Sequence, residues 1–290
     1  MARPDCSPVS ATVCWVTYAI AISVGIYAHL WLDQEFSDYD ALLRGLGANV
    51  AATVVVFLAS LIFNNSSLYD PYWVIPPPLL ATKWVFDGAK NAAFEISRQN
   101  YEFCGGLDLF SMCAAALVWA WAIRFVVGCP WSGWRTGIQD QDWRYVDMLK
   151  QLRDAKVGFL WWVVSFFSLH LTPTILVHLA LAPLHRVMTV VNLDATKGCS
   201  TAFQLFALFF TCACLLWQWV ADEQLRVFRE SLAKAGPQVA KIWNKTMRDG
   251  LWMYSRHPNY FGEVMFWISI YTMHLARCRF NPVLIFQNEP

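Results

Sequence analysis

The chain has 290 residues, of which 57% are hydrophobic and 15% are charged, with a formal net charge of +1. Average soluble domains are about 45–50% apolar and about 25% charged, so this composition excludes an ordinary soluble protein. The apolar content excludes intrinsic disorder, and the near-neutral charge excludes a basic nucleic-acid-binding surface. The composition therefore predicts a membrane protein whose partner is the lipid bilayer rather than a nucleic acid.

Several apolar segments approach or reach the length of about 20 residues that a helix needs to cross a bilayer. Two weaker segments follow the same trend: Tyr72–Phe86 is interrupted by three consecutive prolines, and Tyr260–Ala276 is short, with Glu263 near its start. With these two included, the sequence predicts an all-α, polytopic membrane helix bundle of about seven transmembrane helices, formed by residues 1–290 as a single membrane domain. The five stronger segments are Ala11–Leu32, Ala48–Phe63, Leu107–Gly128, Val157–Ala182 and Phe203–Ala221.

The charges of the loops predict how these segments are oriented. Asp33–Gly47 holds four acidic residues and one arginine, whereas Asp222–His257 holds seven basic residues and four acidic ones. By the positive-inside rule the second loop is cytosolic. Seven spans place the first loop on the opposite side, as its charge requires, and six spans do not. We therefore expect an integral, multi-pass protein whose polar motifs face the cytosol, where soluble cofactors are found.

Familiar cofactor and metal motifs are absent from the sequence. The nine cysteines are scattered without zinc-finger spacing, and the six histidines form no closely spaced cluster, so no metal site is predicted. No glycine-rich fingerprint of the Rossmann or P-loop kind occurs, so any nucleotide must be held in another way.

Polar residues at membrane depth are costly, so they are either paired or functional. The segment Asn64–Trp73 follows the second span and reads as an interfacial turn or as the polar wall of a pocket mouth. Arg124 lies near the end of an apolar segment, where it either snorkels to the interface or serves a site. Asp142–Tyr145 fits an amphipathic helix on the membrane surface. All three lie on the cytosolic side of the seven-span arrangement.

Two later clusters carry more chemistry. Gln218, Asp222 and Arg229 are spaced by four and seven residues, so they share one face of a helix. An aspartate can accept from a ribose hydroxyl and an arginine can fork onto a phosphate, although an ordinary ion pair at a helix end is the alternative. The second cluster is Gly250–Glu263, in which Pro258 is typical of the first turn of a helix. The free N–H groups and the dipole at a helix start suit the binding of a phosphate.

The run Gly250–Glu263, which contains Arg-His-Pro-Asn-Tyr-Phe-Gly-Glu, resembles the C-terminal signature of the steroid 5α-reductase-like membrane proteins. Relatives of that family include sterol reductases of the endoplasmic reticulum and isoprenylcysteine carboxyl methyltransferases. Other segments resemble the same family, so that residues 48–276 form a reductase-like region and residues 277–290 an atypical tail, consistent with a truncated or alternatively spliced form. These segments are Asn65–Trp73, Asp142–Tyr145 and Asp222–Gln224.

The resemblance implies a seven-helix bundle that holds NADPH in a cavity open to the cytosol, in the endoplasmic reticulum membrane. Steroid reductases place a proton-donating tyrosine three residues before an arginine that corresponds to Arg124, but here that position is Trp121. The family's catalytic glutamate has a loose counterpart in Asp70. The resemblance assigns five residues to the cofactor: Asp222, Arg229, Tyr254, Asn259 and Glu263. We expect Arg256 and Tyr260, which lie in the same run, to contact the cofactor too, and we expect Asp70 and Tyr72 to act in catalysis.

Three functions follow from these residues. The first is an NADPH-dependent reductase of a carbon–carbon double bond in a sterol-like or other lipid substrate. The second is an S-adenosylmethionine-dependent membrane methyltransferase; because that cofactor has no phosphate, Arg229 and Arg256 favour the dinucleotide. The third is a non-catalytic, degenerate relative, for which Trp121 and the atypical tail are the arguments.

Overall fold

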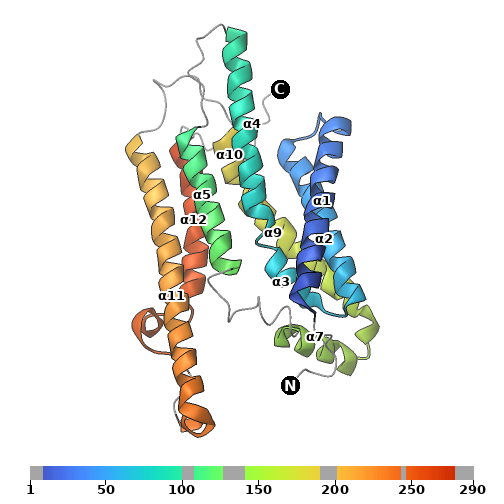
Figure 1. The fold of residues 1–290 in the computed structure, drawn as a ribbon, viewed down its shortest axis with the longest axis vertical. Helices are drawn as coiled ribbons and strands as arrows, with labels where there is room; N and C mark the ends of the chain where they lie inside the picture. Colours follow the sequence, from blue (N-terminus) through green and yellow to red (C-terminus); the bar gives the residue numbers. More distant parts are fainter. Residues whose placement is uncertain (1–8, 100–107, 127–140, 190–200, 243–245, 278–290) are drawn as a thin grey trace. The chain divides into compact units, whose positions relative to one another are not determined.

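Helices account for the regular structure of the protein in a computed structural model (Figure 1). The described residues contain no strand, in agreement with the predicted all-α class. The structure describes residues 9–99, 108–126, 141–189, 201–242 and 246–277. The chain divides into two compact units, each described by itself below. Unit 1 comprises Met1–Leu80 and Phe125–Ala182, and unit 2 comprises Ala81–Arg124 and Pro183–Pro290.

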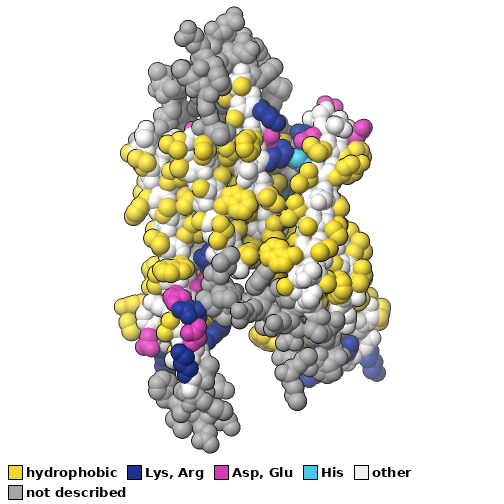
Figure 2. All heavy atoms as spheres, in the orientation of Figure 1, with side chains coloured by type: hydrophobic (Ala, Val, Ile, Leu, Met, Phe, Trp, Pro, Cys, Tyr) yellow, Lys and Arg dark blue, Asp and Glu magenta, His cyan; other side chains and the backbone are white. Residues whose placement is uncertain are grey.

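Five helical stretches of the described chain are long and apolar enough to cross a membrane, and they match the five stronger predicted segments. Much of their apolar surface is exposed, as lipid contact requires, and hydrophobic side chains cover the helices in the space-filling view (Figure 2). The predicted total of seven spans stays a prediction, because the two weaker segments are helical but less apolar. The five stretches are Ala11–Glu35, Ala41–Ile62, Leu109–Val126, Gly158–Ala180 and Thr201–Leu232.

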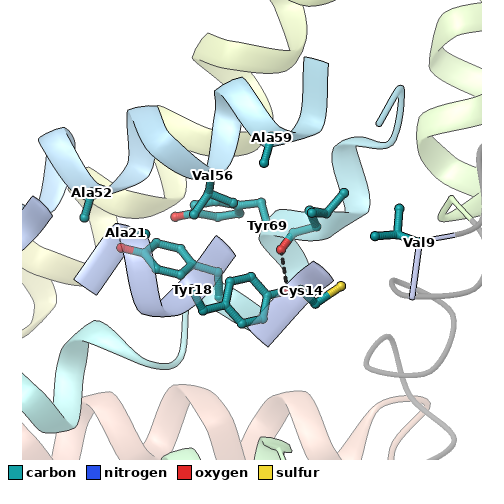
Figure 3. Close-up of a cluster of buried hydrophobic side chains, with 10 residues drawn as sticks. Val9, Cys14, Tyr18, Ala21, Ala52, Val56, Ala59 and Tyr69 are labelled. Atoms are coloured by element: carbon teal, nitrogen blue, oxygen red, sulfur yellow. Dashed lines mark hydrogen bonds between the residues drawn. The ribbon is translucent and has the colours of Figure 1, made fainter. Parts of the chain in front are cut away.

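In unit 1, α1 (Ala11–Glu35) and α2 (Ala41–Ile62) form an antiparallel hairpin. Small residues allow close packing: a Cβ placed on Gly25 would lie 3.2 Å from the Cβ of Ala52. Side chains such as Cys14, Tyr18 and Val56 form the core between them (Figure 3). The Tyr18 hydroxyl donates to the Leu68 carbonyl oxygen at 2.8 Å, which attaches the segment after α2 to this core.

The segment after α2 contains a 3₁₀ turn η1 (Ser66–Leu68) and one turn of helix α3 (Tyr69–Tyr72). Helix α4 (Pro76–Gln99) then begins at the first of the three prolines. The expectation that these prolines interrupt a helix is therefore corrected: they start one. Proline is tolerated in the first helical turn because the amide hydrogen that it lacks has no intrahelical acceptor there.

The remaining helices of unit 1 are α7 (Trp143–Asp154) and a continuous series that follows it. That series comprises η2 (Gly158–Leu160), α8 (Trp161–Val164), the π-helical segment η3 (Ser165–Leu171) and α9 (Thr172–Ala180). The widened turns of η3 precede Pro173, which cannot donate the usual backbone hydrogen bond.

Unit 2 begins at Ala81 and therefore contains most of α4. Its other described helices are α5 (Leu109–Val126), α10 (Ala182–Thr189), α11 (Thr201–Ile242), the 3₁₀ turn η5 (Gly250–Met253) and α12 (Pro258–Arg277). Helices α11 and α12 pack along each other, and glycine permits their close approach. A Cβ on Gly262 of α12 would lie 2.6 Å from Cγ of Gln218 on α11. This pairing brings the start of α12 beside the middle of α11, where the polar residues lie.

Candidate functional site

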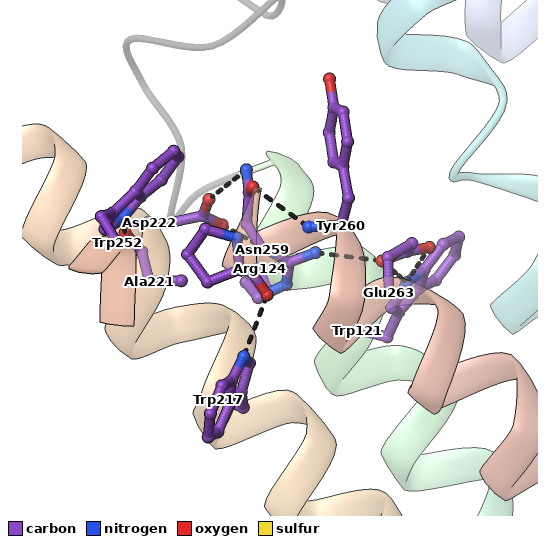
Figure 4. A network of polar contacts seen from close by, with 10 residues as sticks. Trp121, Arg124, Trp217, Ala221, Asp222, Trp252, Asn259, Tyr260 and Glu263 are labelled. Carbon is purple, nitrogen blue, oxygen red and sulfur yellow. Dashed lines mark hydrogen bonds and ion pairs between the residues drawn. The ribbon is translucent and has the colours of Figure 1, made fainter. Parts of the chain in front are cut away.

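Three helices of unit 2 each contribute a charged side chain to one network (Figure 4). Arg124 comes from the last turn of α5, Asp222 from α11 and Glu263 from the second turn of α12. The Arg124 guanidinium pairs through Nη1 with Asp222 Oδ2 and lies 3.4 Å through Nη2 from Glu263 Oε2. The three side chains are only 10%, 12% and 23% exposed. Charges this deeply placed need such partners, so the arginine holds the two carboxylates together.

Two tryptophans complete the hydrogen bonding of Glu263. The indole Nε1 of Trp121 donates to both carboxylate oxygens, at 3.1 and 3.2 Å, and Nε1 of Trp267 donates to Oε1 at 3.0 Å. The sequence indicated that Glu263 enters the membrane and must be paired, but it did not indicate these donors. The N–H of Trp121 is thus used to hold Glu263.

Asn259 connects the start of α12 to the same network. Its Nδ2 donates to Asp222 Oδ1 at 3.2 Å, and its Oδ1 accepts from the backbone N–H of Tyr260 at 3.0 Å. The structure therefore brings together three of the residues predicted to contact a cofactor, Asp222, Asn259 and Glu263, and adds Arg124 to them.

The indole N–H groups of two further tryptophans hold the backbone around this network. Nε1 of Trp217 donates to the Pro258 carbonyl oxygen, and Nε1 of Trp252 donates to the Ala221 carbonyl oxygen, both at 2.9 Å. Sequence analysis missed both contacts, because tryptophan near a membrane boundary is expected at the interface in any case. These bonds tie η5 and the first residue of α12 to α11, which sets the position of Asn259.

The other predicted cofactor residues are exposed. Tyr254 is 81% exposed, and Tyr260 is 62% exposed with its ring stacked on His257. Arg229 and Arg256 are also exposed, and within the described part of the chain no side chain pairs with either. By contrast, Arg226 on the same helix is held by Glu223 and Glu230. Arg229 and Arg256 can therefore accept an anion, whereas Arg226 is already neutralised.

The two proposed catalytic residues lie in unit 1. The Tyr145 hydroxyl donates to Asp70 Oδ1 at 2.6 Å, and the Asp142 backbone N–H donates to Ser67 Oγ at 2.8 Å. The predicted polar segments Asn64–Trp73 and Asp142–Tyr145 are thus in contact. Burial raises the pKa of Asp70 to about 6, although hydrogen bonds from Tyr145 and Ser67 act in the opposite direction.

Tyr72 differs from Asp70 in its surroundings. It is 1% exposed, and its ring lies 5.8 Å between centroids from the rings of both Tyr18 and Tyr69. Tyr69 is held in turn by a hydrogen bond of 2.7 Å between its hydroxyl and that of Thr174 on α9. Tyr72 is therefore a core side chain of unit 1, and its catalytic assignment, like that of Asp70, stays a prediction.

Comparison with known families gives one match. The family described as "Protein of unknown function (DUF1295)" matches residues 56–286, which is most of the chain and includes every residue of the network above. The chain belongs to this family. No curated protein matches the chain. No solved structure matches it either.

Replacing Arg124 with methionine tests the network. The change leaves two buried carboxylates without their shared cation, which typically costs about 3–5 kcal/mol, so we expect a clear fall in apparent melting temperature of detergent-purified protein. The matched control is Arg226→Met, which removes an arginine of a surface ion-pair cluster on α11 and should change little. Equal melting temperatures for the two variants would show that Arg124 is not an essential counter-ion.

The contact between Asp70 and Tyr145 predicts a pH-dependent attachment of α7. A carboxyl whose pKa is raised in the attached state stabilises attachment at low pH, and that stabilisation is lost as the pH rises through about 6. The pKa of Asp70 is about 6 when α7 is attached, and we take it to have its ordinary value of 3.8 when α7 is detached. With these two values, the equilibrium constant for attachment should fall about tenfold between pH 5 and pH 8. Hydrogen exchange of the α7 amides, corrected for intrinsic rates, measures this attachment equilibrium.

Other titratable or charged groups also face Asp70. They are Asp142 and Arg144, which pair with each other, and Tyr18 and Tyr69.

Asp70→Asn supplies the decisive comparison for that measurement. The amide cannot ionise, so protection of α7 should become independent of pH and should exceed that of the wild type at pH 8. Asp147→Asn, an exposed carboxylate on α7 itself, is the control and should keep the wild-type pH profile. If Asp70→Asn keeps the wild-type profile too, another group controls the attachment.

Proposed function

We propose that the protein is a membrane-embedded, NADPH-dependent reductase of a carbon–carbon double bond in a sterol-like or other lipid substrate. The observation that carries this proposal is the network of unit 2, in which Asp222, Asn259 and Glu263 are joined by Arg124. The resemblance of Gly250–Glu263 to the signature of the steroid 5α-reductase-like proteins supports it. We further propose that the protein resides in the endoplasmic reticulum membrane, with this network facing the cytosol.

The residues of unit 2 suit the parts of NADPH. Phosphates need cationic donors, and Arg229 and Arg256 offer exposed guanidinium groups that no described side chain neutralises. Ribose hydroxyls and an amide need mixed donors and acceptors, which Asp222 and Asn259 provide. Tyr254 and Tyr260 present exposed rings in the same segment. Bound NADPH would supply the hydride, and the protein would hold and orient it.

Proton delivery needs a separate group, because a reduced double bond takes up one hydride and one proton. Trp121 has only an indole N–H, which is donated to Glu263. Asp70 and Tyr72 remain the proposed catalytic residues. Of the two, Asp70 has the better properties: with a pKa of about 6 it is partly protonated near neutral pH, as a general acid should be.

A methyltransferase is the alternative, because isoprenylcysteine carboxyl methyltransferases have a helix start similar to the one at Pro258. S-Adenosylmethionine carries no phosphate, so Arg229 and Arg256, with which no side chain of the described ranges pairs, favour the dinucleotide over it. A non-catalytic relative would bind neither cofactor.

Thermal stability of the detergent-purified protein distinguishes these functions. A ligand at one hundred times its dissociation constant stabilises the folded state by about 2.7 kcal/mol, so NADPH should raise the melting temperature and S-adenosylmethionine should not. Removing an arginine that binds a phosphate should weaken NADPH about tenfold or more, in Arg229→Ala and in Arg256→Ala. The control is Arg226→Ala, whose guanidinium is held by two glutamates. Stabilisation by S-adenosylmethionine alone, or by neither ligand, contradicts the reductase proposal.

A further inference from the structure

Gln218 is a buried polar residue that the network described above does not use. It lies on α11 one turn before Asp222, and its side chain is fully buried. Neither its Oε1 nor its Nε2 has a hydrogen-bond partner among the described residues. A carboxamide has two N–H donors and an oxygen acceptor, and leaving all of them unpaired in an apolar span is costly. The side chain therefore calls for a partner that the protein itself does not provide.

The surroundings of Gln218 place it at the edge of the polar network. A Cβ on Gly262 would lie 2.6 Å from Cγ of Gln218, so the backbone of α12 directly adjoins this side chain. Glu263 follows Gly262 immediately, and Asn259 precedes it by three residues, so the same turn of α12 carries both. Gln218 is thus beside the residues that the proposed function assigns to NADPH.

Pairing between the two helices does not explain Gln218. Buried polar side chains in membrane proteins often hydrogen-bond across helices, and α11 and α12 do so elsewhere. The Thr211 hydroxyl donates to Ser269 Oγ at 2.9 Å, two turns earlier on α11. Gln218 takes no part in such a bond, although the backbone of Gly262 lies against it.

We propose that Gln218 contacts the ligand and recognises the primary carboxamide of the nicotinamide ring. Its Nε2–H donates to the carboxamide oxygen, and its Oε1 accepts from the carboxamide N–H, which satisfies both groups at once. This inference rests on the proposed function and assigns an end of the cofactor to a residue. Arg229 lies eleven residues further along the same face, about 16 Å at the helical rise, so one stripe of α11 reaches from the nicotinamide to a phosphate.

The test compares two probes in Gln218→Met, a change that keeps the length of the side chain and removes its polar atoms. The probes are NADPH and its reduced 3-acetylpyridine analogue, in which a methyl ketone replaces the carboxamide. Wild-type protein should bind the analogue about tenfold more weakly than NADPH, as expected for a lost hydrogen bond. Gln218→Met should bind NADPH about tenfold more weakly than the wild type and should not distinguish the two probes.

The chain offers a matched control on the same helix. Gln204 is half-buried on α11, fourteen residues before Gln218, or about 21 Å along the helix. Gln204→Met makes the same chemical change away from the network, so it should keep both the wild-type affinity for NADPH and the discrimination against the analogue.

A second measurement needs no ligand. Gln218→Met removes an unpaired carboxamide from the core, so the ligand-free protein should melt at a higher temperature than the wild type. A lower melting temperature would mean that Gln218 is paired within the protein and would overturn the inference. If Gln218→Met cannot be purified folded, Gln218→Leu tests the same point.

The binding test has its own contradicting outcomes. The inference is also overturned if Gln218→Met binds NADPH as tightly as the wild type or still distinguishes NADPH from the analogue. A wild type that binds no NADPH contradicts the proposed function and this assignment together, whereas NADPH binding unaffected by Gln218→Met contradicts this assignment alone.

Discussion

The ion pairs of Arg124 with Asp222 and Glu263 are the contacts on which the account of unit 2 depends. A guanidinium and two carboxylates at membrane depth are each costly alone, and they become tolerable because α5, α11 and α12 bring them together. The indoles of Trp121 and Trp267 then satisfy the carboxylate oxygens of Glu263. The three helices are thereby fixed at this end, and Asn259 and Asp222 take defined positions relative to each other.

Such a network can be structural or functional, and three features favour function. A purely structural ion pair would not require the start of α12 to be held by Trp217 and Trp252. It would also not leave Arg229 and Arg256 exposed and without a partner among the described side chains. Nor would it place Gln218, which has no hydrogen-bond partner in the described part of the chain, against the turn that carries Glu263. Together these groups offer cationic, amide and carboxylate contacts along one face of α11 and the first turns of α12.

The spans and the polar ends of the helices could be predicted because the signals are local. Apolar length identified segments such as Ala11–Leu32, and helical spacing placed Gln218, Asp222 and Arg229 on one face. The triple proline was misread, since proline breaks a helix interior but starts a helix equally well. Whether the prolines fall inside a helix or at its start depends on where the preceding segment ends. That segment is held by the hydrogen bond from Tyr18 to Leu68, a contact between distant residues.

Contacts between residues far apart in the sequence could not be predicted from sequence patterns. Trp121 donates to Glu263, and Tyr145 donates to Asp70, across long stretches of intervening chain. That Gln218 lacks a hydrogen-bond partner among the described residues is visible only in the structure. The measurement that tests the central claim most directly is energy transfer from tryptophan to the reduced nicotinamide during titration with NADPH. A cofactor held beside Trp121, Trp217 and Trp267 predicts a saturable signal that Asn259→Ala weakens; a wild-type protein that gives no saturable signal would contradict the account.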